Sequence, residues 1–318
     1  MLASRAAICL GPKPASISRP NSPACSRAAL PALPLASTEN RNIIFPQGQP
    51  SLPSKGQRMN EFASRNPTTR FSGLEATYDR YRPDYPEALW KFLQEHCQLP
   101  DRPMVVDVGC GTGISSRQMA GRGWNLVGIE PNAAMRQVAE SRNGDWAGQL
   151  IFRDGKAEST GLPDNFADLV VAAQAFHWFR ADEALREFQR ILKPHGHAAL
   201  AWNERDVGDP FTARYESAIQ GISPEKAIAE SSQAATGEAL LRHQLFEAAI
   251  RVEFSHQQVL DREGIVGRAL SISFGPRDAE GRERLSETMR QLFHEFAVDG
   301  KVAIRYRTVA FVAHGRCL

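Results

Sequence analysis

From residue 70 onward, short apolar runs alternate with amphipathic stretches along the chain. Five of the runs predict strands, at Met104–Val108, Leu126–Glu130, Leu150–Phe152, Leu169–Ala173 and Ala198–Trp202. Between them, apolar residues recur at helical spacing over residues 114–121, 132–141 and 182–192. Strands that alternate with helices of this length are typical of a parallel sheet covered by helices on both faces.

The pattern changes on either side of this alternating core. An aromatic-rich stretch from Tyr78 to Leu93 predicts a helix before the first strand. After Asn203, residues 211–249 are predicted to be helical, with Phe211, Tyr215 and Ile219 four apart on one face.

Two further strands and one helix complete the prediction. Residues 251–260 alternate as a strand does, and Val302, Ile304 and Tyr306 follow at a period of two. Between these strands an apolar helical stripe contains Leu285, Met289, Leu292, Phe293 and Phe296. The predicted fold class is therefore α/β: a seven-stranded, mostly parallel sheet with helices on both faces and helical insertions after the fifth and sixth strands.

Residues 1–58 differ in composition from the rest of the chain. They hold nine of the 20 prolines and seven Lys or Arg against one acid, Glu39. This composition predicts a disordered leader, either an organellar transit peptide or translated sequence ahead of a true start at Met59. We therefore predict a domain over residues 59–318 in the cytoplasm, or in a mitochondrion or plastid if the leader is a transit peptide.

The charge of the remaining chain narrows the classes of partner. Because the whole chain carries +2 and residues 1–58 carry +6, residues 59–318 carry −4. An acidic domain argues against nucleic acid as partner. No apolar run is long enough for a membrane span, and five cysteines without a CxxC pair predict neither a disulfide framework nor a metal site. These features favour a small molecule as the partner. The sequence does not indicate the oligomeric state.

The first predicted strand leads into the glycine loop Gly109-Cys110-Gly111-Thr112-Gly113, and a helix follows at once. Such a strand–loop–helix turn is where open α/β sheets bind nucleotides. A dinucleotide site has the spacing GxGxxG, whereas Ile114 stands where the third glycine of that motif would be. The spacing GxGxG therefore argues against a nicotinamide oxidoreductase. The glycine loop can also be interpreted as a purely structural turn that binds no ligand.

The second predicted strand ends at Glu130 within Gly128-Ile129-Glu130-Pro131-Asn132. A carboxylate at this place can accept hydrogen bonds from both hydroxyls of a ribose. An exposed acid at a strand end is the alternative, and the preceding glycine loop favours the ribose.

Together these segments resemble a known family. The motifs are VVDVGCGTG (105–113), GIEPN (128–132), KAESTGLPDNFADLV (156–170), AQAFHWF (173–179) and ILKPHGHAAL (191–200). They are similar to the class I S-adenosylmethionine-dependent methyltransferases, in particular the type 11 group with the trans-aconitate methyltransferase-like proteins. The resemblance covers about residues 70–315. It implies a Rossmann-like methyltransferase fold with a cofactor-binding core at 104–203 and substrate-shaping elements at 70–93 and 204–300.

The resemblance also implies roles for individual residues, with S-adenosyl-L-methionine as cofactor. Residues expected around the methionine part are Asp107, Gly109, Gly111 and Gly113. Glu130 is expected on the ribose, with Ala157 and Glu158 lining the adenine.

Candidate residues for the methyl acceptor follow the fourth strand and lie in the first helix. His177 can orient or deprotonate an acceptor, because the pKa of histidine lies near working pH, and Trp178 shapes the pocket. Tyr78, Tyr81 and Arg82 are expected to cover the site; packing on the sheet is the alternative for these side chains. The acceptor is predicted to be a small molecule such as a carboxylic acid. A silent cofactor-binding protein is the second hypothesis.

Overall fold

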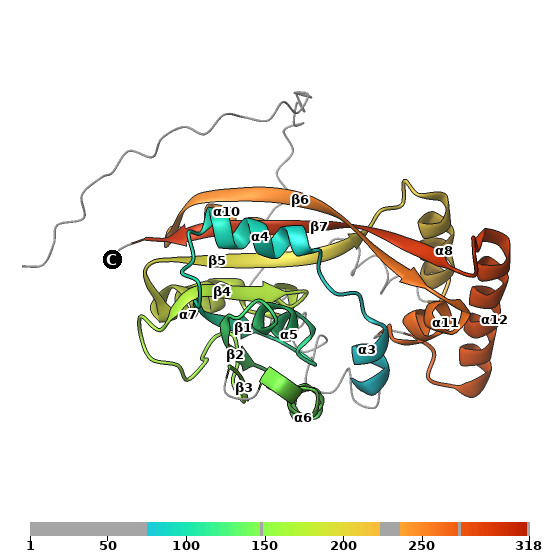
Figure 1. The fold of residues 1–318 in the computed structure, drawn as a ribbon, viewed down its shortest axis with the longest axis horizontal. Helices are drawn as coiled ribbons and strands as arrows, with labels where there is room; N and C mark the ends of the chain where they lie inside the picture. The colour runs from blue at the N-terminus through green and yellow to red at the C-terminus, as the bar shows by residue number, and fades with distance from the viewer. Residues whose placement is uncertain (1–74, 147–148, 223–235, 273–274, 317–318) are drawn as a thin grey trace, which may run out of the picture. The chain divides into compact units, whose positions relative to one another are not determined.

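The computed structural model describes residues 75–146, 149–222, 236–272 and 275–316, all within one compact unit. The predicted leader, residues 1–58, lies outside the described residues. Seven strands form one sheet in the order β3-β2-β1-β4-β5-β7-β6 (Figure 1). Their bounds are β1 Met104–Val108, β2 Asn125–Ile129, β3 Leu150–Arg153, β4 Ala167–Ala173, β5 Leu192–Arg205, β6 Phe246–Leu260 and β7 Val302–Gly315.

The first five strands pair in parallel, whereas β7 runs antiparallel between β5 and β6. The predicted mostly parallel, seven-stranded sheet is thus confirmed. Strands β5 and β7 are longer than the sequence predicted, because they pair with each other from His197↔His314 to Arg205↔Tyr306.

Helices cover both faces of the sheet. They are α3 Glu75–Tyr81, α4 Glu87–His96, α5 Ile114–Ala120, α6 Ala133–Ser141, α7 Ala181–Ile191, α8 Pro210–Gln220, α10 Glu238–Arg242, α11 Arg262–Leu270 and α12 Ala279–Phe296. One core cluster joins α7 and α10 to Val106 and Val108 of β1, and a second joins α4 and α5 to Val105 on the opposite face. Successive side chains of a strand point to opposite faces, so a strand buried on both must be apolar throughout.

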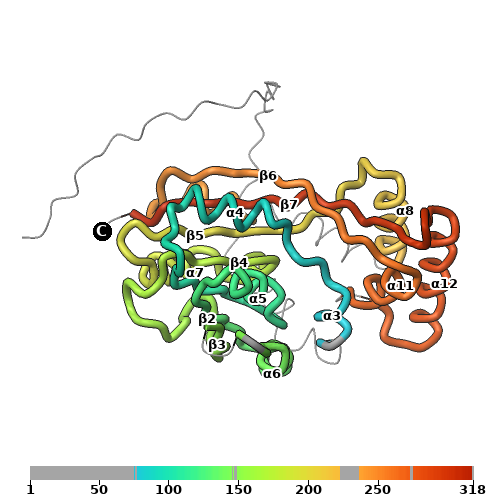
Figure 2. Tube along the Cα trace, viewed as in Figure 1, coloured from blue at the N-terminus to red at the C-terminus, as the bar shows by residue number. Residues whose placement is uncertain are grey.

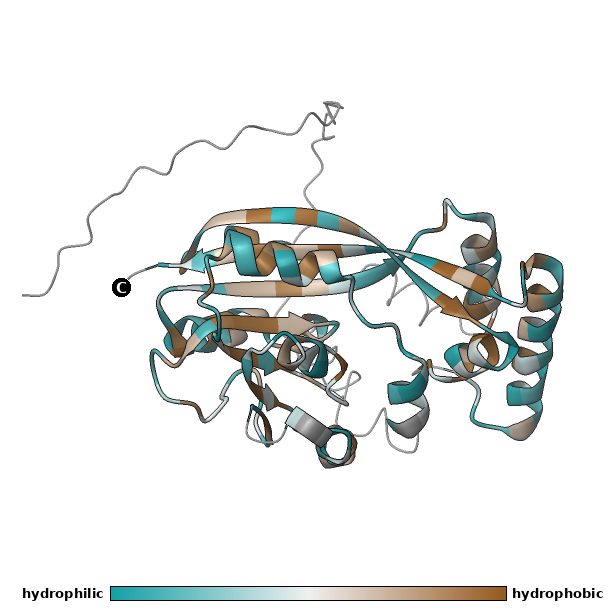
Figure 3. Cartoon of the chain, in the orientation of Figure 1, coloured by the Kyte–Doolittle hydropathy of each residue, from teal (hydrophilic) through white to brown (hydrophobic). Residues whose placement is uncertain are grey.

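A third core cluster lies at the far end of the β6–β7 pair. There α8, α11 and α12 gather around the ends of the two strands (Figure 2). The predicted stripe on α8 is buried, with Phe211 6% exposed and Tyr215 and Ile219 fully enclosed. Strand β6 alternates in exposure along its length, and Figure 3 shows the same alternation in hydropathy.

Three sequence predictions need correction. The helix expected from Tyr78 to Leu93 is divided into α3 and α4, because Pro83 and Pro86 cannot continue a helix. Residues 246–249, expected to be helical, begin β6, while 223–235 lie outside the described residues. Helix α11 was not predicted; it contains Gly264 and Gly267, which weaken a helical pattern.

The sheet order fixes where a ligand can bind. From β1 the chain proceeds to β2 and β3 on one side, then crosses to β4 on the other side of β1. At such a switch point the loops after neighbouring strands diverge and leave a crevice at the carboxyl ends of the strands. The loops after β1 and β4 therefore bound the candidate site.

Candidate functional site

The glycine loop after β1 is tied to the end of β2. The backbone N–H groups of Gly109 and Cys110 both donate to the carbonyl of Ile129, at 2.8 and 3.2 Å. A Cβ atom on Gly109 would lie 2.7 Å from the Cβ of Ala175, closer than van der Waals contact allows. Glycine is therefore required where the loops after β1 and β4 touch. Gly113, with a φ of 81°, precedes the first residue of α5.

Glu130 directly follows β2 and faces the loop. One carboxylate oxygen accepts from the backbone N–H of Gly111 at 3.0 Å, and the other accepts from Asn132 N–H at 2.8 Å. Burial raises the pKa of Glu130, and these two hydrogen bonds oppose the rise. Because a carboxylate can accept about four hydrogen bonds, Glu130 keeps lone pairs for two hydroxyl donors.

Asp107 lies beneath the loop, fully buried in β1. Its Oδ2 accepts from the hydroxyls of Ser115 and Ser116 at 2.7 and 2.6 Å, while its Oδ1 is enclosed without a partner among the described residues. Burial raises the pKa of Asp107 to about 6, against the lowering effect of the two hydroxyls. The carboxyl thus fixes the first turn of α5 by two hydrogen bonds and, when ionised, places a buried negative charge under the loop.

A pocket of about 450 Å³ opens above these residues. Its glycine-loop end is formed by Gly109–Thr112, Glu130–Asn132 and Lys156–Glu158. Here the backbone N–H of Arg180 donates to Glu158 at 2.8 Å. Residues predicted for the cofactor that line this end are Gly109, Gly111, Glu130, Ala157 and Glu158.

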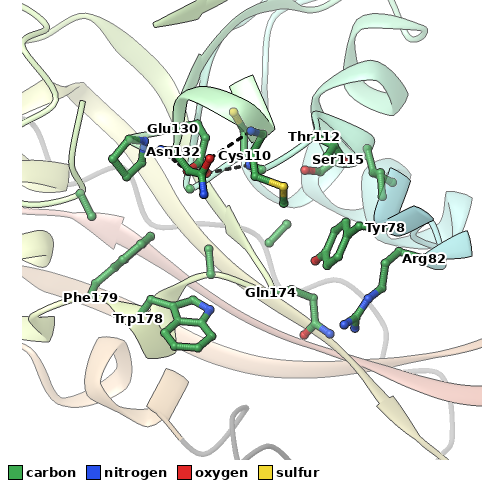
Figure 4. Close-up of a pocket in the computed structure, with 18 of the residues that line it drawn as sticks. Tyr78, Arg82, Cys110, Thr112, Ser115, Glu130, Asn132, Gln174, Trp178 and Phe179 are labelled. Carbon is green, nitrogen blue, oxygen red and sulfur yellow. Dashed lines mark hydrogen bonds between the residues drawn. The ribbon is translucent and has the colours of Figure 1, made fainter. Parts of the chain in front are cut away.

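The opposite part of the pocket, here the arginine end, is formed by Tyr78, Arg82, Gln174 and Asn203. Figure 4 shows Tyr78, Arg82 and Gln174 on the same side, away from Glu130 and Asn132. The Arg82 guanidinium lies 4.6 Å from the centre of the Tyr78 ring and donates to the carbonyl of Ser271 at 3.3 Å. Among the lining residues the only acids are Glu130 and Glu158, both at the glycine-loop end.

Trp178, Tyr78 and Arg82, which were predicted to shape or cover the acceptor site, line this pocket, whereas other predicted residues lie outside the lining. The Tyr81 ring is turned toward α11, where a Cβ on Gly267 would lie 2.4 Å from it. Asp107 lies beneath the loop, and Gly113 is the last residue of the loop before α5; neither lines the pocket.

His177 does not line the pocket either. Its Nδ1 accepts from the indole N–H of Trp202 at 3.3 Å. An imidazole that accepts at Nδ1 carries its proton on Nε2, so this arrangement offers no free basic nitrogen. His177 therefore lies outside the pocket lining and beside Trp178, whose ring centre is 4.9 Å away.

Sequence reasoning missed many lining residues, among them the three polar residues Asn132, Asn203 and Gln174. Asn132 caps α6 through its Oδ1, and the GIEPN motif contains it. Asn203 donates to the carbonyl of Asp84 at 2.8 Å and accepts from Thr308 at 2.6 Å, which depends on contacts between distant segments. Gln174 follows β4 and lies within the AQAFHWF motif, yet its residue type alone gave no signal.

Among the described residues, no helix has the length and apolarity to cross a membrane. These residues also contain no group of three or more His, Cys, Asp or Glu side chains placed to hold a metal ion.

Comparison with known proteins bears on the same region. Residues 106–200 match the family model described as "Methyltransferase domain". An uncharacterized methyltransferase of Schizosaccharomyces pombe is 31% identical over 46% of this chain and 57% of its own length. One of Mycobacterium bovis is 34% identical over 45% of this chain and 55% of its own length. The chain thus spans about half the length of the curated relatives it matches.

A structural comparison agrees with the fold. A protein from Anaeromyxobacter dehalogenans, named as a proposed type II methyltransferase, superposes with a TM-score of 0.51 and 22% identity. The match covers 74% of this chain and 98% of that protein, and at this identity it shows the fold alone.

The sheet order and the family match agree with each other. Residues 106–200 match a methyltransferase domain model, and the sheet that contains them has the Rossmann-like methyltransferase fold. The match and the fold support S-adenosyl-L-methionine as its cofactor.

Proposed function

We propose that the protein transfers a methyl group from S-adenosyl-L-methionine to a small-molecule carboxylic acid. The observation that carries this proposal is that Arg82 lines the end of the pocket that has no lining acid. At the other end, the acids Glu130 and Glu158 are accompanied by the cations Lys156 and Arg180. Guanidinium groups bind carboxylates by charge-assisted hydrogen bonds, often two at once. An anionic acceptor therefore suits the arginine end.

The glycine-loop end has the donors and acceptors that a sulfonium nucleoside requires. We assign the ribose hydroxyls to Glu130, which retains lone pairs beside its two backbone donors. Ala157 and Glu158 are assigned to the adenine, and Gly109 and Gly111 to the methionine part. Asp107 lies beneath that loop and accepts hydrogen bonds from the first turn of α5, and Gly113 joins the loop to α5.

The cofactor supplies a methyl group already activated on a sulfonium. A carboxylate oxygen of the acceptor forms the bond to the methyl carbon as the carbon–sulfur bond breaks, and the electron pair stays on sulfur. No proton is released, so no general base is required. The chain mainly aligns the acceptor and excludes water, which are effects worth effective molarities of about 10⁵–10⁸ M. In this scheme His177 orients the pocket wall through Trp178.

Release of S-adenosylhomocysteine from a panel of acids, phenols and amines tests the proposal. We expect carboxylic acids to be methylated, and Arg82→Gln to lower kcat/KM for them by about 10–150-fold, the value of charge-assisted hydrogen bonds of about 1.5–3 kcal/mol. Cofactor affinity, measured by calorimetry, should stay the same. Arg284→Gln, on the exposed surface of α12, is the matched control.

Other outcomes favour other functions. Tight cofactor binding without product from any acceptor favours a silent cofactor-binding protein. If the protein prefers neutral acceptors, and Arg82→Gln leaves kcat/KM unchanged, the proposed carboxylic acid acceptor is contradicted. Binding of NAD in place of S-adenosylmethionine removes the whole assignment.

We further propose that the protein acts in the cytoplasm on small molecules rather than nucleic acid, in keeping with the −4 charge of residues 59–318. Mass spectrometry of the native N-terminus tests the compartment. A start at Met59 supports the cytoplasm, and cleavage within residues 1–58 supports an organelle.

A further inference from the structure

Gln174, at the carboxyl end of β4, has two unfavourable features at once. Its φ is 54°, in the left-handed region that a side chain with a Cβ adopts at a cost. Its Oε1 is enclosed and has no hydrogen-bond partner among the described residues. An unsatisfied buried carbonyl is unfavourable, and such strain tends to gather at functional sites.

The location of Gln174 separates it from similar residues. The other described non-glycine residues with positive φ are Gln98, Asn165, His195, Ala248 and Asp299. None of these lines the pocket, whereas Gln174 does. The combination of strain and an unsatisfied polar atom therefore coincides with the switch point of the sheet.

The left-handed turn itself has a structural purpose. The N–H of Gln174 still donates to Ala201 of β5 at 2.8 Å, so the residue is held by the sheet. The turn then carries the chain across β1, where Ala175 and Phe179 pack against Gly109. Glycine or asparagine would make this turn at lower cost. The turn explains the backbone but not the glutamine side chain.

The surroundings indicate what the side chain does. Gln174 and Arg82 line the same end of the pocket, which has no lining acid, and Figure 4 shows them on the same side of it. Arg82 can only donate hydrogen bonds, whereas the Gln174 carbonyl can accept one. Rotation about the last torsion of a carboxamide is soft, so Oε1 can turn toward a ligand.

We propose that Gln174 positions the methyl acceptor by accepting a hydrogen bond from it, and that the acceptor is a carboxylic acid bearing a hydroxyl or amino group. This inference rests on the proposed function. Arg82 holds the carboxylate, and Gln174 receives the neighbouring O–H or N–H. Two directional contacts fix the angle at which the carboxylate oxygen faces the methyl group, which one ion pair does not.

Matched acids with and without the hydroxyl test this proposal: lactate against propionate, malate against succinate, and mandelate against phenylacetate. The measured quantity is the ratio of kcat/KM within each pair. For the wild type we expect a ratio of about ten or more in favour of the hydroxy acid in at least one pair, because a site that hydrogen bonds a hydroxyl discriminates against its absence. Gln174→Met keeps the length of the side chain, and should bring that ratio to about one.

Gln98 supplies the matched control, because it is also a glutamine with positive φ, of 48°, and is exposed outside the pocket. Gln98→Met should leave the ratio unchanged. Gln174→Gly and Gln98→Gly should both raise the melting temperature, because glycine adopts a positive φ without strain. Only Gln174→Gly should lose the preference for the hydroxy acid. A merely structural role for Gln174 predicts no such separation.

The outcomes distinguish this inference from the proposed function. Methylation of acids at equal efficiency within every pair, or a ratio that survives Gln174→Met, overturns the role of Gln174 and leaves the proposed function intact. Failure to methylate any acid, despite cofactor binding, overturns the proposed function and this inference with it.

Discussion

The two ends of the pocket are built in different ways. At the glycine-loop end, the lining comes from backbone groups and from runs of three or four residues, each beginning within three residues of the end of a strand. At the arginine end, side chains from α3, the end of β4 and the end of β5 meet, and Ser271 beyond α11 holds Arg82. The first end is defined by local sequence, and the second by tertiary packing.

This contrast has a physical cause. A loop that binds through N–H groups needs particular backbone angles, and glycine spacing records those angles directly. A site made of side chains needs only that several segments converge, which leaves no fixed spacing in the chain. Changes at the two ends should therefore affect different measurements, cofactor affinity at one and acceptor kinetics at the other.

The largest effect is expected for Gly111→Val. Gly111 has a φ of 57° and lines the pocket, and a Cβ there would meet only the end of the flexible Met135 side chain. The valine side chain therefore occupies ligand space, and S-adenosylmethionine should bind at least about 200-fold more weakly by calorimetry.

Gly123→Val is the control for backbone strain. Gly123 has a φ of 85° with open space around it, and it lies outside the pocket lining. Both variants should lose similar stability, so normal cofactor binding by Gly111→Val would show that the loop does not contact the ligand.

A smaller effect is expected for Glu130→Ala. Loss of charge-assisted hydrogen bonds, worth about 1.5–3 kcal/mol, should weaken the binding of S-adenosylmethionine by about 10–150-fold. KM for the acceptor should change little, because the arginine end is untouched. Glu140→Ala, an exposed acid on α6, is the control. Unchanged cofactor affinity in Glu130→Ala would place the ribose elsewhere.

The same contrast explains what the sequence could predict. Strands β1 to β4 were located to within two residues at both ends, because buried parallel strands are apolar runs. Strands β6 and β7, whose exposed parts alternate, were located correctly at one end only. Strand β5 was predicted as Ala198–Trp202 but spans Leu192–Arg205. Its additional residues lack an apolar run: at the C-terminal end Asn203–Arg205 pair with β7, and at the N-terminal end Leu192 and His197 pair with β4.

The candidate site divides in the same manner. The spacing of glycines and the acid after β2 located the glycine-loop end, where Gly111 and Glu130 line the pocket. His177 was predicted from the chemistry of its ring. It lies outside the pocket lining, and its Nδ1 accepts a hydrogen bond from Trp202, a residue 25 positions away that the sequence did not connect to it. Gln174 was passed over because its left-handed backbone and enclosed carbonyl exist only in the folded chain.

The smallest effect is expected from the titration of Asp107. Burial raises the pKa of this carboxyl to about 6 from its ordinary value of 3.8. The folded state therefore binds the proton more tightly than the unfolded state, so this group favours folding at low pH and that contribution is lost as pH rises through 6. Cofactor binding has the opposite dependence, because the ionised carboxyl attracts the cationic cofactor.

At pH 5 about one tenth of Asp107 is ionised, so affinity for S-adenosylmethionine should fall by at most about tenfold between pH 7 and pH 5. Asp107→Asn should bind with lower affinity at pH 7 and show little dependence on pH, as measured by calorimetry across this range. Glu130 is the other carboxyl at this end whose pKa is raised by burial. A pH dependence that persists in Asp107→Asn would therefore assign the titration to Glu130, at the surface of the pocket, rather than to the charge beneath the loop.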